Sequence, residues 1–375
     1  MIKHSPATAS ATAFACNLFV HLAEAAPQRN TFISPASIAL ALAMVYNGAC
    51  GDTRRAIART LELDESDTDD LNEANAALQQ QLSQLDSHIQ IAIANALWVS
   101  DTFQLDCGFV HTVEHEYQAA VQTLDFAHQP VAQIVNDWVA AHTAGKITRL
   151  IDQLDRDTLL LLVNAIYFKG QWTEPFNRQL TQDGPFTLPG ERQIQVPMMA
   201  QRSKYRYYED RAFQAVALPY GGGRVCMYIV LPRPDVSLER FIHQLNGKDW
   251  ERWMTHFSNT EGRLVLPRFR IAYEVKLNNT LKDMGMGIAF DRRADFSAMA
   301  GDGAHLHIDE VRHKSFIEVN EEGTEAAAVT SVSMMRASFA PQKLFSMVVD
   351  RPFFCAIRDE RSGTMLFMGA IVDPS

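Results

Sequence analysis

Apolar residues are spaced as in helices over the first ninety positions of the chain. One stripe between Phe14 and Leu22 follows steps of three and four residues, and the preceding Ser5-Pro6 favours a helix start. A second stripe of this kind predicts an amphipathic helix over residues 68–87. Asp52 is placed to cap a further helix between these two. The amino-terminal quarter is therefore expected to be mainly helical.

Strand patterns dominate the rest of the chain. Ile89, Ile91 and Ile93 alternate with smaller or polar residues, and the continuous apolar run TLLLLVNAIYF (158–168) is typical of a strand buried on both faces. Helices are expected over residues 131–143, ended by Gly145, and over residues 274–284. Further strands are expected at 224–232, 263–271, 314–319, 345–357 and 365–372. Helices first and strands later, with no Pro/Gly/Ser linker, predict one α+β domain spanning residues 1–375.

Composition narrows the class of protein. Hydrophobic residues make up 47% of the chain, which excludes intrinsic disorder, and no apolar run reaches the ~18–20 residues of a membrane span. The net charge of −10 argues against binding to nucleic acid. The five cysteines are odd in number, form no CxxC pair and are expected to be small core residues. Reduced thiols and no visible signal peptide favour the cytoplasm; a leader missing from this sequence would instead indicate a secreted or periplasmic protein.

No catalytic motif is found. The chain has no GxSxG, HExxH, Walker A or GxGxxG pattern, and its twelve histidines suggest no metal cluster. No enzymatic activity, metal or cofactor is therefore expected. The protein should act by binding or by changing shape.

The segment between Asn320 and Pro341 is unusual for a connection between strands. No glycine or proline follows Gly323 until Pro341, and residues 324–335 are nearly all small, β-branched or apolar. Solvated loops favour Gly, Pro, Asn and Asp, so this segment could pair as a strand, with a small and uncharged face from Thr324 to Val332. An edge hairpin or a flexible linker would have a similar composition. Composition alone leaves these interpretations open.

Six segments, in this order, give the chain a family resemblance. They are NTFISPASIALALAMVYNGACGDT, GKITRLIDQLDRDTLLLLVNAIYFKGQWTEPF, VPMMAQ, LPYGGG followed by YIVLP, NEEGTEAAAVTS, and VVDRPFFCAIRDERSGTMLFMGAIVDP. Together they span residues 30–374 and resemble the corresponding segments of serpins. The fifth is similar to the hinge of the reactive-centre loop in inhibitory members of that family.

The resemblance implies a serpin fold of three β-sheets and eight or nine helices, with a reactive-centre loop over residues 321–341. It also implies a suicide-substrate inhibitor: a serine protease cleaves the loop, becomes acylated, and is trapped when the loop inserts into the main sheet as a new strand. The residues that match the hinge are Glu322, Gly323, Thr324, Glu325, Ala326, Ala327 and Ala328. Small residues on the inserting face favour inhibition over a chaperone, carrier or storage role, which remains the alternative.

Two anchors of the resemblance locate the scissile bond. In the family, the scissile bond lies at a nearly fixed distance after the hinge glycine and before the proline of the C-terminal signature. Counted from Gly323 and from Pro352, both distances end at Ala337, so the bond is expected between Ala337 and Ser338. A small residue before the bond suits an elastase-like or subtilisin-like protease. Cleavage after Arg336 would instead indicate a trypsin-like target, and cleavage after Met335 a chymotrypsin-like one.

Further positions match functional regions of the family. Ser34, Ser37, Asn164 and His313 match the shutter, a polar cluster beneath the sheet where strands must separate, and Trp172 matches the breach, where insertion begins. Without the resemblance, Ser34 would be a helix cap, His313 an ordinary strand residue and Trp172 a core residue.

Two expectations concern partners. The predicted helix over residues 68–87 has no lysine or arginine, whereas heparin-activated members carry a basic face there, so no heparin activation is expected. The uncharged run AAAVTSV (326–332) has high β-propensity and could insert into the sheet of another molecule. We therefore expect a monomer that polymerises on mild heating.

Overall fold

The amino-terminal part of the protein is helical, as its apolar spacing predicts. The computed structural model describes residues 6–63, 68–301, 305–324 and 344–375. The first elements are α1 (Pro6–Ala25), β1 (Thr31–Ile33), α2 (Pro35–Gly48), α3 (Gly51–Thr60) and α4 (Thr68–Ser83). Pro35 begins α2 behind Ser34, whose side chain accepts a hydrogen bond from the Ser37 amide.

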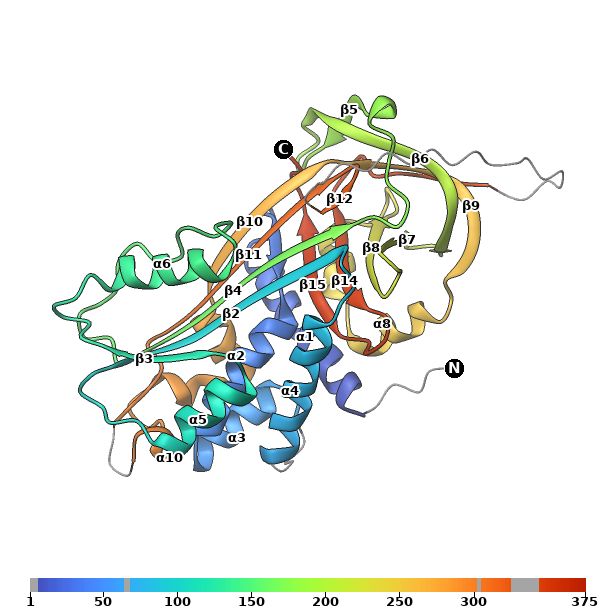
Figure 1. Ribbon diagram of the computed structural model, residues 1–375. Helices are drawn as coiled ribbons and strands as arrows, with labels where there is room; N and C mark the ends of the chain where they lie inside the picture. Colours follow the sequence, from blue (N-terminus) through green and yellow to red (C-terminus); the bar gives the residue numbers. More distant parts are fainter. Residues whose placement is uncertain (1–5, 64–67, 302–304, 325–343) are drawn as a thin grey trace.

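A six-stranded sheet crosses the molecule in the order β10-β11-β12-β4-β2-β3 (Figure 1). Its strands are β2 (Ile89–Ser100), β3 (Ala120–Leu124), β4 (Leu160–Gln171), β10 (Phe269–Lys276), β11 (Glu310–Asn320) and β12 (Gly323–Thr324). β4 is buried on both faces because its side chains alternate between two cores. Leu160 and Leu162 pack with α2, whereas Leu161 and Val163 pack with α6 (Val131–His142) on the opposite face. The continuous apolar run in the sequence reflects this double burial.

The second sheet has nine strands and two portions. Its strands are β1, β5 (Gln182–Thr187), β6 (Gln193–Glu209), β7 (Phe213–Tyr220), β8 (Val225–Pro232), β9 (Ser258–Pro267), β13 (Phe345–Val348), β14 (Phe353–Asp359) and β15 (Met365–Ile371). β6 pairs with β5 and β9 in one portion and with β7 in the other. The three sheets expected from the resemblance therefore correspond to the six-stranded sheet and to these two portions, which the long β6 joins.

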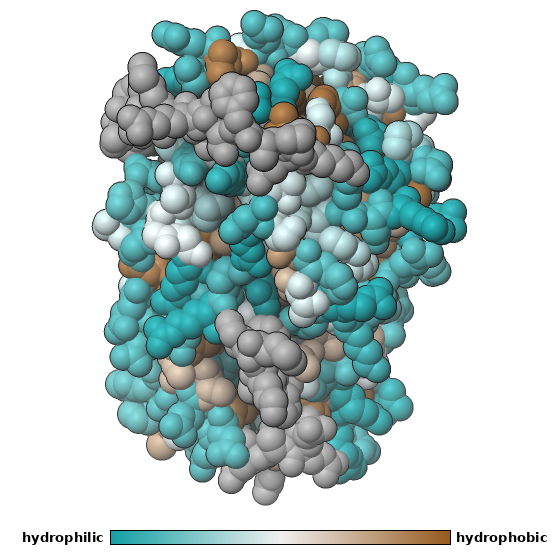
Figure 2. All heavy atoms as spheres, turned by 90° about the vertical axis from the view of Figure 1, so that its right-hand side faces the viewer, coloured by the Kyte–Doolittle hydropathy of each residue, from teal (hydrophilic) through white to brown (hydrophobic). Residues whose placement is uncertain are grey.

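Shorter helices complete the described part of the chain: α5 (Cys107–Glu116), α7 (Leu238–His243), α8 (Gly247–Met254), α9 (Asn278–Leu281) and α10 (Ser297–Ala300). None of the helices in the described ranges is both long enough and apolar enough to span a bilayer. The face shown in Figure 2 is mainly hydrophilic, with apolar side chains in small groups. The most exposed large apolar side chains of the described residues are Leu180 and Leu344.

Local expectations fail where tertiary contacts override the pattern. The helix expected over residues 274–284 begins only at Asn278, because β10 continues to Lys276 in register with β11. The helix expected over residues 68–87 ends at Ser83. Beyond it, the Asp86 carboxylate accepts hydrogen bonds from two backbone amides and turns the chain into β2.

Two assignments of single residues are also corrected. Asp52 lies inside the first turn of α3, whose N-cap is Cys50. Its negative charge therefore stabilises the helix through the positive end of the helix dipole, but its side chain does not cap the helix. The cysteines were all expected in the core, but Cys107 is exposed and Cys50 only partly buried. Both lie at the start of helices, where a small residue is tolerated at the surface. All five cysteines are free thiols.

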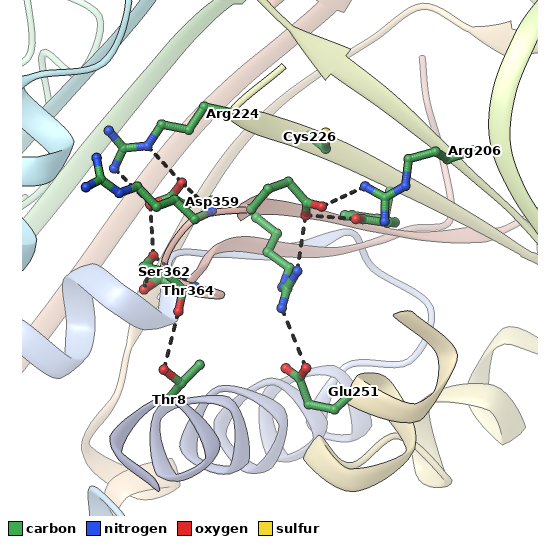
Figure 3. Close-up of polar contacts among 12 residues, drawn as sticks. Thr8, Arg206, Arg224, Cys226, Glu251, Asp359, Ser362 and Thr364 are labelled. Atoms are coloured by element: carbon green, nitrogen blue, oxygen red, sulfur yellow. Dashed lines mark hydrogen bonds and ion pairs between the residues drawn. The ribbon is translucent and has the colours of Figure 1, made fainter. Parts of the chain in front are cut away.

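A network of ion pairs fixes the β14–β15 hairpin to its surroundings (Figure 3). Arg224 contacts both carboxylate oxygens of Asp359 at 3.0 Å, and Arg206 lies 2.6 Å from Glu360. Burial alone would raise the pKa of Asp359, but hydrogen bonds from Arg224 and Ser362 lower it, so the buried carboxylate stays charged. The chain that follows the predicted loop is therefore anchored by its own strand pairing and ion pairs.

Candidate functional site: the junction of β11, β12 and β4

The strand β12 lies between β11 and β4 at one end of the six-stranded sheet (Figure 1). Thr324 pairs with Val319 of β11 on one side and with Gly170 of β4 on the other. Past this point β11 and β4 pair directly with each other, from Phe316 opposite Tyr167 to Glu310 opposite Leu161. Gly323 and Thr324, which follow the turn after β11, are therefore already part of the sheet.

Gly323 is the residue that allows this entry. Its φ is 146°, and a Cβ atom there would lie 2.0 Å from the Gly170 carbonyl oxygen, so only glycine fits. The hinge residues that follow, Glu325, Ala326, Ala327 and Ala328, lie outside the described residues. So do the predicted scissile-bond residues Ala337 and Ser338 and the alternatives Met335 and Arg336.

Thr324 is held by Tyr220, the last residue of β7 in the nine-stranded sheet, which stacks on Trp172 just after β4. Its side chain is fully buried, and its Oγ1 lies 2.8 Å from the hydroxyl of Tyr220. Tyr220 stacks on Trp172 with ring centroids 4.3 Å apart, and the Trp172 indole N–H donates to the Asn320 carbonyl. Burial holds the pKa of Tyr220 well above its ordinary value, so the phenol keeps its proton. Trp172, predicted at the breach, thus lies where β12 enters the sheet.

Two acidic residues before β12 are fixed by basic partners. The Glu321 carboxylate is 2% exposed and accepts hydrogen bonds from Thr181 and from Arg268, whose Nε lies 2.8 Å away. Burial opposes ionisation of Glu321, but these hydrogen bonds outweigh it and lower its pKa. Glu322 forms an ion pair with Arg178. The turn that leads from β11 into β12 is therefore anchored on both of its residues.

A row of three polar side chains crosses the sheet below β12. Asn95 of β2, Asn164 of β4 and His313 of β11 are register neighbours, and we call them the polar row. The His313 Nδ1 and Asn164 Oδ1 atoms are 2.6 Å apart, and the Asn164 amide donates to Asn95 Oδ1. All three side chains are buried. The contact between His313 and Asn164 joins β11 to β4 where the two strands pair directly.

The start of α2 supports this row from below. The Asn164 amide also donates to the Ser37 carbonyl, and the Ser34 backbone N–H donates to His313 Nε2 at 3.3 Å. Because Nε2 accepts, Nδ1 carries the proton and donates to Asn164. Burial lowers the pKa of His313 to about 3, so the imidazole is neutral at ordinary pH. The structure brings all four predicted shutter residues together, and Ser34 is also the helix cap that the alternative interpretation expected.

Removing the Asn164 side chain is expected to destabilise the protein by about 3 kcal/mol or more. Asn164→Ala leaves the His313 N–H, the Asn95 Oδ1 and the Ser37 hydroxyl without their partner inside the core, at roughly 1–3 kcal/mol for each group left unsatisfied. The urea concentration at the midpoint of the first unfolding transition, followed by tryptophan fluorescence and compared with the wild type, measures this loss of stability.

Asn95→Ala is the matched control on the next strand. Its Oδ1 accepts one hydrogen bond, and its Nδ2 has no partner among the described side chains, so about 1 kcal/mol is expected. Equal losses for the two variants would contradict a network centred on Asn164.

Several residues of this site were not predicted from the sequence. Tyr220, Arg268 and Thr181 come from other segments, and nothing in their local sequence relates them to the hinge. Asn95 could have been identified from the sequence as a buried polar residue, because it is the one side-chain amide within the otherwise apolar run IAIANALWV. A polar residue in the middle of a buried strand needs a hydrogen-bond partner.

The whole chain matches a known family. The family model described as Serpin (serine protease inhibitor) matches residues 9–374. The leukocyte elastase inhibitor of Equus caballus is 35% identical over 376 residues, covering 97% of this chain and 98% of that protein. Neuroserpin of Gallus gallus is 33% identical over 372 residues, covering 96% of this chain and 89% of that protein.

Solved structures agree with the sequence comparisons. The thermophilic serpin tengpin in its native state superimposes with a TM-score of 0.90 at 28% identity, covering 98% of this chain and 94% of that chain. Human thyroxine-binding globulin in complex with its hormone superimposes with a TM-score of 0.91 at 28% identity, covering 98% of both chains. A match over nearly the entire length, by sequence and by fold, leads to one conclusion: this chain belongs to the serpin family.

Proposed function

We propose that this protein inhibits serine proteases as a suicide substrate. The protease serine attacks the carbonyl carbon of the scissile bond, the bond to the next residue breaks, and an ester joins the enzyme to the new carboxyl end of the loop. β11 and β4 then separate, and the freed hinge extends β12 between them and carries the acylated protease with it. The observation that supports this most directly is that Gly323 and Thr324 already pair with both strands.

The described structure defines what must change during insertion. Seven register pairs between β11 and β4 have to separate. A new strand in between gains a hydrogen-bonded neighbour on each side, at about 1 kcal/mol net for each backbone bond. His313 of β11 and Asn164 of β4 lie on the two strands that separate, so their hydrogen bond must break when the hinge inserts between them. The polar row would then hold β11 and β4 together until the backbone hydrogen bonds of the inserting strand compensate for its loss.

The proposed scissile bond is Ala337–Ser338, and the proposed targets are elastase-like or subtilisin-like proteases. The small side chain of Ala337 is suited to a small specificity pocket. The name of the relative from Equus caballus describes an inhibitor of leukocyte elastase, which is compatible with this target class. Arg336 keeps a trypsin-like target as the alternative. No heparin activation is proposed, because α4 contains no lysine or arginine.

A carrier role is the competing function within the family, since thyroxine-binding globulin has the same fold. The hinge from Thr324 to Ala328 contains only small residues apart from Glu325, and its first buried position is a threonine that fits the sheet. Insertion of a strand needs this small face, whereas binding of a hormone does not. The hinge therefore supports the inhibitory role.

Mixing the protein with an elastase-like and, separately, a trypsin-like protease tests the proposal. A complex that survives SDS, together with a fragment beginning at Ser338 in denaturing mass spectrometry, is the expected result. Denaturation is needed because residues 344–375 stay paired through β13, β14 and β15. A fragment beginning at Ala337 would move the bond to Arg336 and the target to the trypsin class. Cleavage without any stable complex would argue for the non-inhibitory role.

A further inference from the structure

The helix α5 separates its side chains into a core face and a solvent face. Phe109 and Val113, one turn apart, are buried, whereas His111 and His115 are exposed. A step of two residues turns about 200° around a helix, so the two histidines point away from the core. In Figure 1, α5 lies at the opposite end of the six-stranded sheet from β12.

The two imidazoles lie next to each other. Their ring centroids are 4.2 Å apart and their planes are inclined by 43°. Within the described part of the chain, neither ring has a hydrogen-bond or ion-pair partner that would occupy its nitrogen atoms. A pair of unengaged imidazoles, one turn apart on a rigid helix, is arranged for a shared ligand.

We propose that His111 and His115 bind a divalent transition-metal ion, Zn²⁺ or Cu²⁺, between them. Imidazole nitrogen suits these ions, with Zn–N bonds of about 2.0–2.1 Å, and two histidines at positions i and i+4 of a helix can reach one ion. Harder ions such as Mg²⁺ prefer oxygen ligands and are not expected to bind here.

The site is open and water completes it. No group of three His, Cys, Asp or Glu side chains is arranged for a metal among the described residues, so the protein supplies two ligands and solvent the others. Cys107 is exposed one turn before His111 but does not join the pair as a third ligand. The ion would link two turns of α5 and stabilise the helix. The inference is independent of the proposed inhibitory function, because α5 carries none of the residues assigned to the hinge or the polar row.

Titration of the full chain with ZnCl₂ in an isothermal calorimeter tests the site. One equivalent of Zn²⁺ is expected to bind to the wild-type protein, and MgCl₂ is expected to give no binding. His111→Ala and His115→Ala each remove one of two ligands. Loss of a residue that only supports a metal ligand typically weakens metal affinity by roughly 10–100-fold. Each of these variants loses a ligand itself, so its Zn²⁺ affinity is expected to fall by at least this factor. Alanine favours the helix, and both positions are exposed, so the variants should fold.

His128→Ala is the matched control, because the His128 side chain is 83% exposed and pairs with Asp125 rather than with a second imidazole. It should bind Zn²⁺ as the wild type does. A second readout is the melting temperature, which Zn²⁺ should raise in the wild type and in His128→Ala but not in the two α5 variants. Absence of stoichiometric binding to the wild type, or unchanged binding by both α5 variants, would overturn the proposal.

Discussion

Replacing Thr324 by arginine is expected to abolish inhibition while leaving cleavage of the loop intact. Thr324 is fully buried between β11 and β4, with Tyr220 at 2.8 Å and the stacked Trp172 behind it. No carboxylate contacts Thr324 in the described structure, so a guanidinium at this position would be desolvated without a partner, at a cost of several kcal/mol. The hinge of Thr324→Arg should therefore stay outside the sheet, and the acyl-enzyme should hydrolyse before insertion traps it.

The yield of SDS-stable complex against cleaved inhibitor, with a saturating elastase-like protease, measures this effect. Thr324→Val is the matched control, since it keeps the β-branched shape and removes only the hydroxyl. It should retain complex formation and lose about 1 kcal/mol of stability through the Tyr220 contact. Complex formation by Thr324→Arg at the wild-type yield would show that inhibition does not require this residue to enter the sheet.

Acidification is expected to destabilise the native protein well above the pH at which carboxylates titrate. In the fold, burial lowers the pKa of His313 to about 3, whereas an exposed histidine titrates near 6.5. The unfolded chain therefore binds a proton that the native state excludes, and the contribution of His313, fully present above pH 6.5, is lost as the pH falls towards 3. The loss should be about 1.4 kcal/mol per pH unit, thus about 2 kcal/mol at pH 5 and on the order of 4–5 kcal/mol at pH 3.

Urea denaturation between pH 7 and pH 5 measures this contribution before most carboxylates take up protons. Glu321, whose pKa is lowered by Arg268 and Thr181, adds a loss of the same sign only at lower pH. The control is His313→Gln, whose amide can accept from Ser34 and donate to Asn164 but does not titrate. Its stability should be flat over this interval. A wild-type protein with equally flat stability would show that His313 is not the neutral, buried group described above.

Much of the fold could be predicted because local patterns and burial agree. The run 158–168 is apolar without interruption, and the structure buries β4 between α2 and α6, which is the arrangement that such a run favours. Gly145 has a positive φ after α6, as expected for a residue that ends a helix. The predictions failed at 274–284, where pairing with β11 outweighed a helical pattern. Local propensity is weak compared with a row of inter-strand hydrogen bonds.

The sequence by itself determined the family and predicted the four polar shutter positions and the hinge glycine Gly323, because these rest on motifs contained in short segments. Only the tertiary structure decided that Gly323 and Thr324 are already inserted, that Tyr220 holds Thr324, and that Asn95 extends the polar row. It also decided that β11 and β4 pair directly with each other beyond β12. These facts depend on contacts between segments that are far apart in the sequence, such as Tyr220 with Thr324 and Gly170 with Thr324. No local pattern encodes such contacts, because the partner's identity is fixed only when the sheets assemble and buried polar groups select one another.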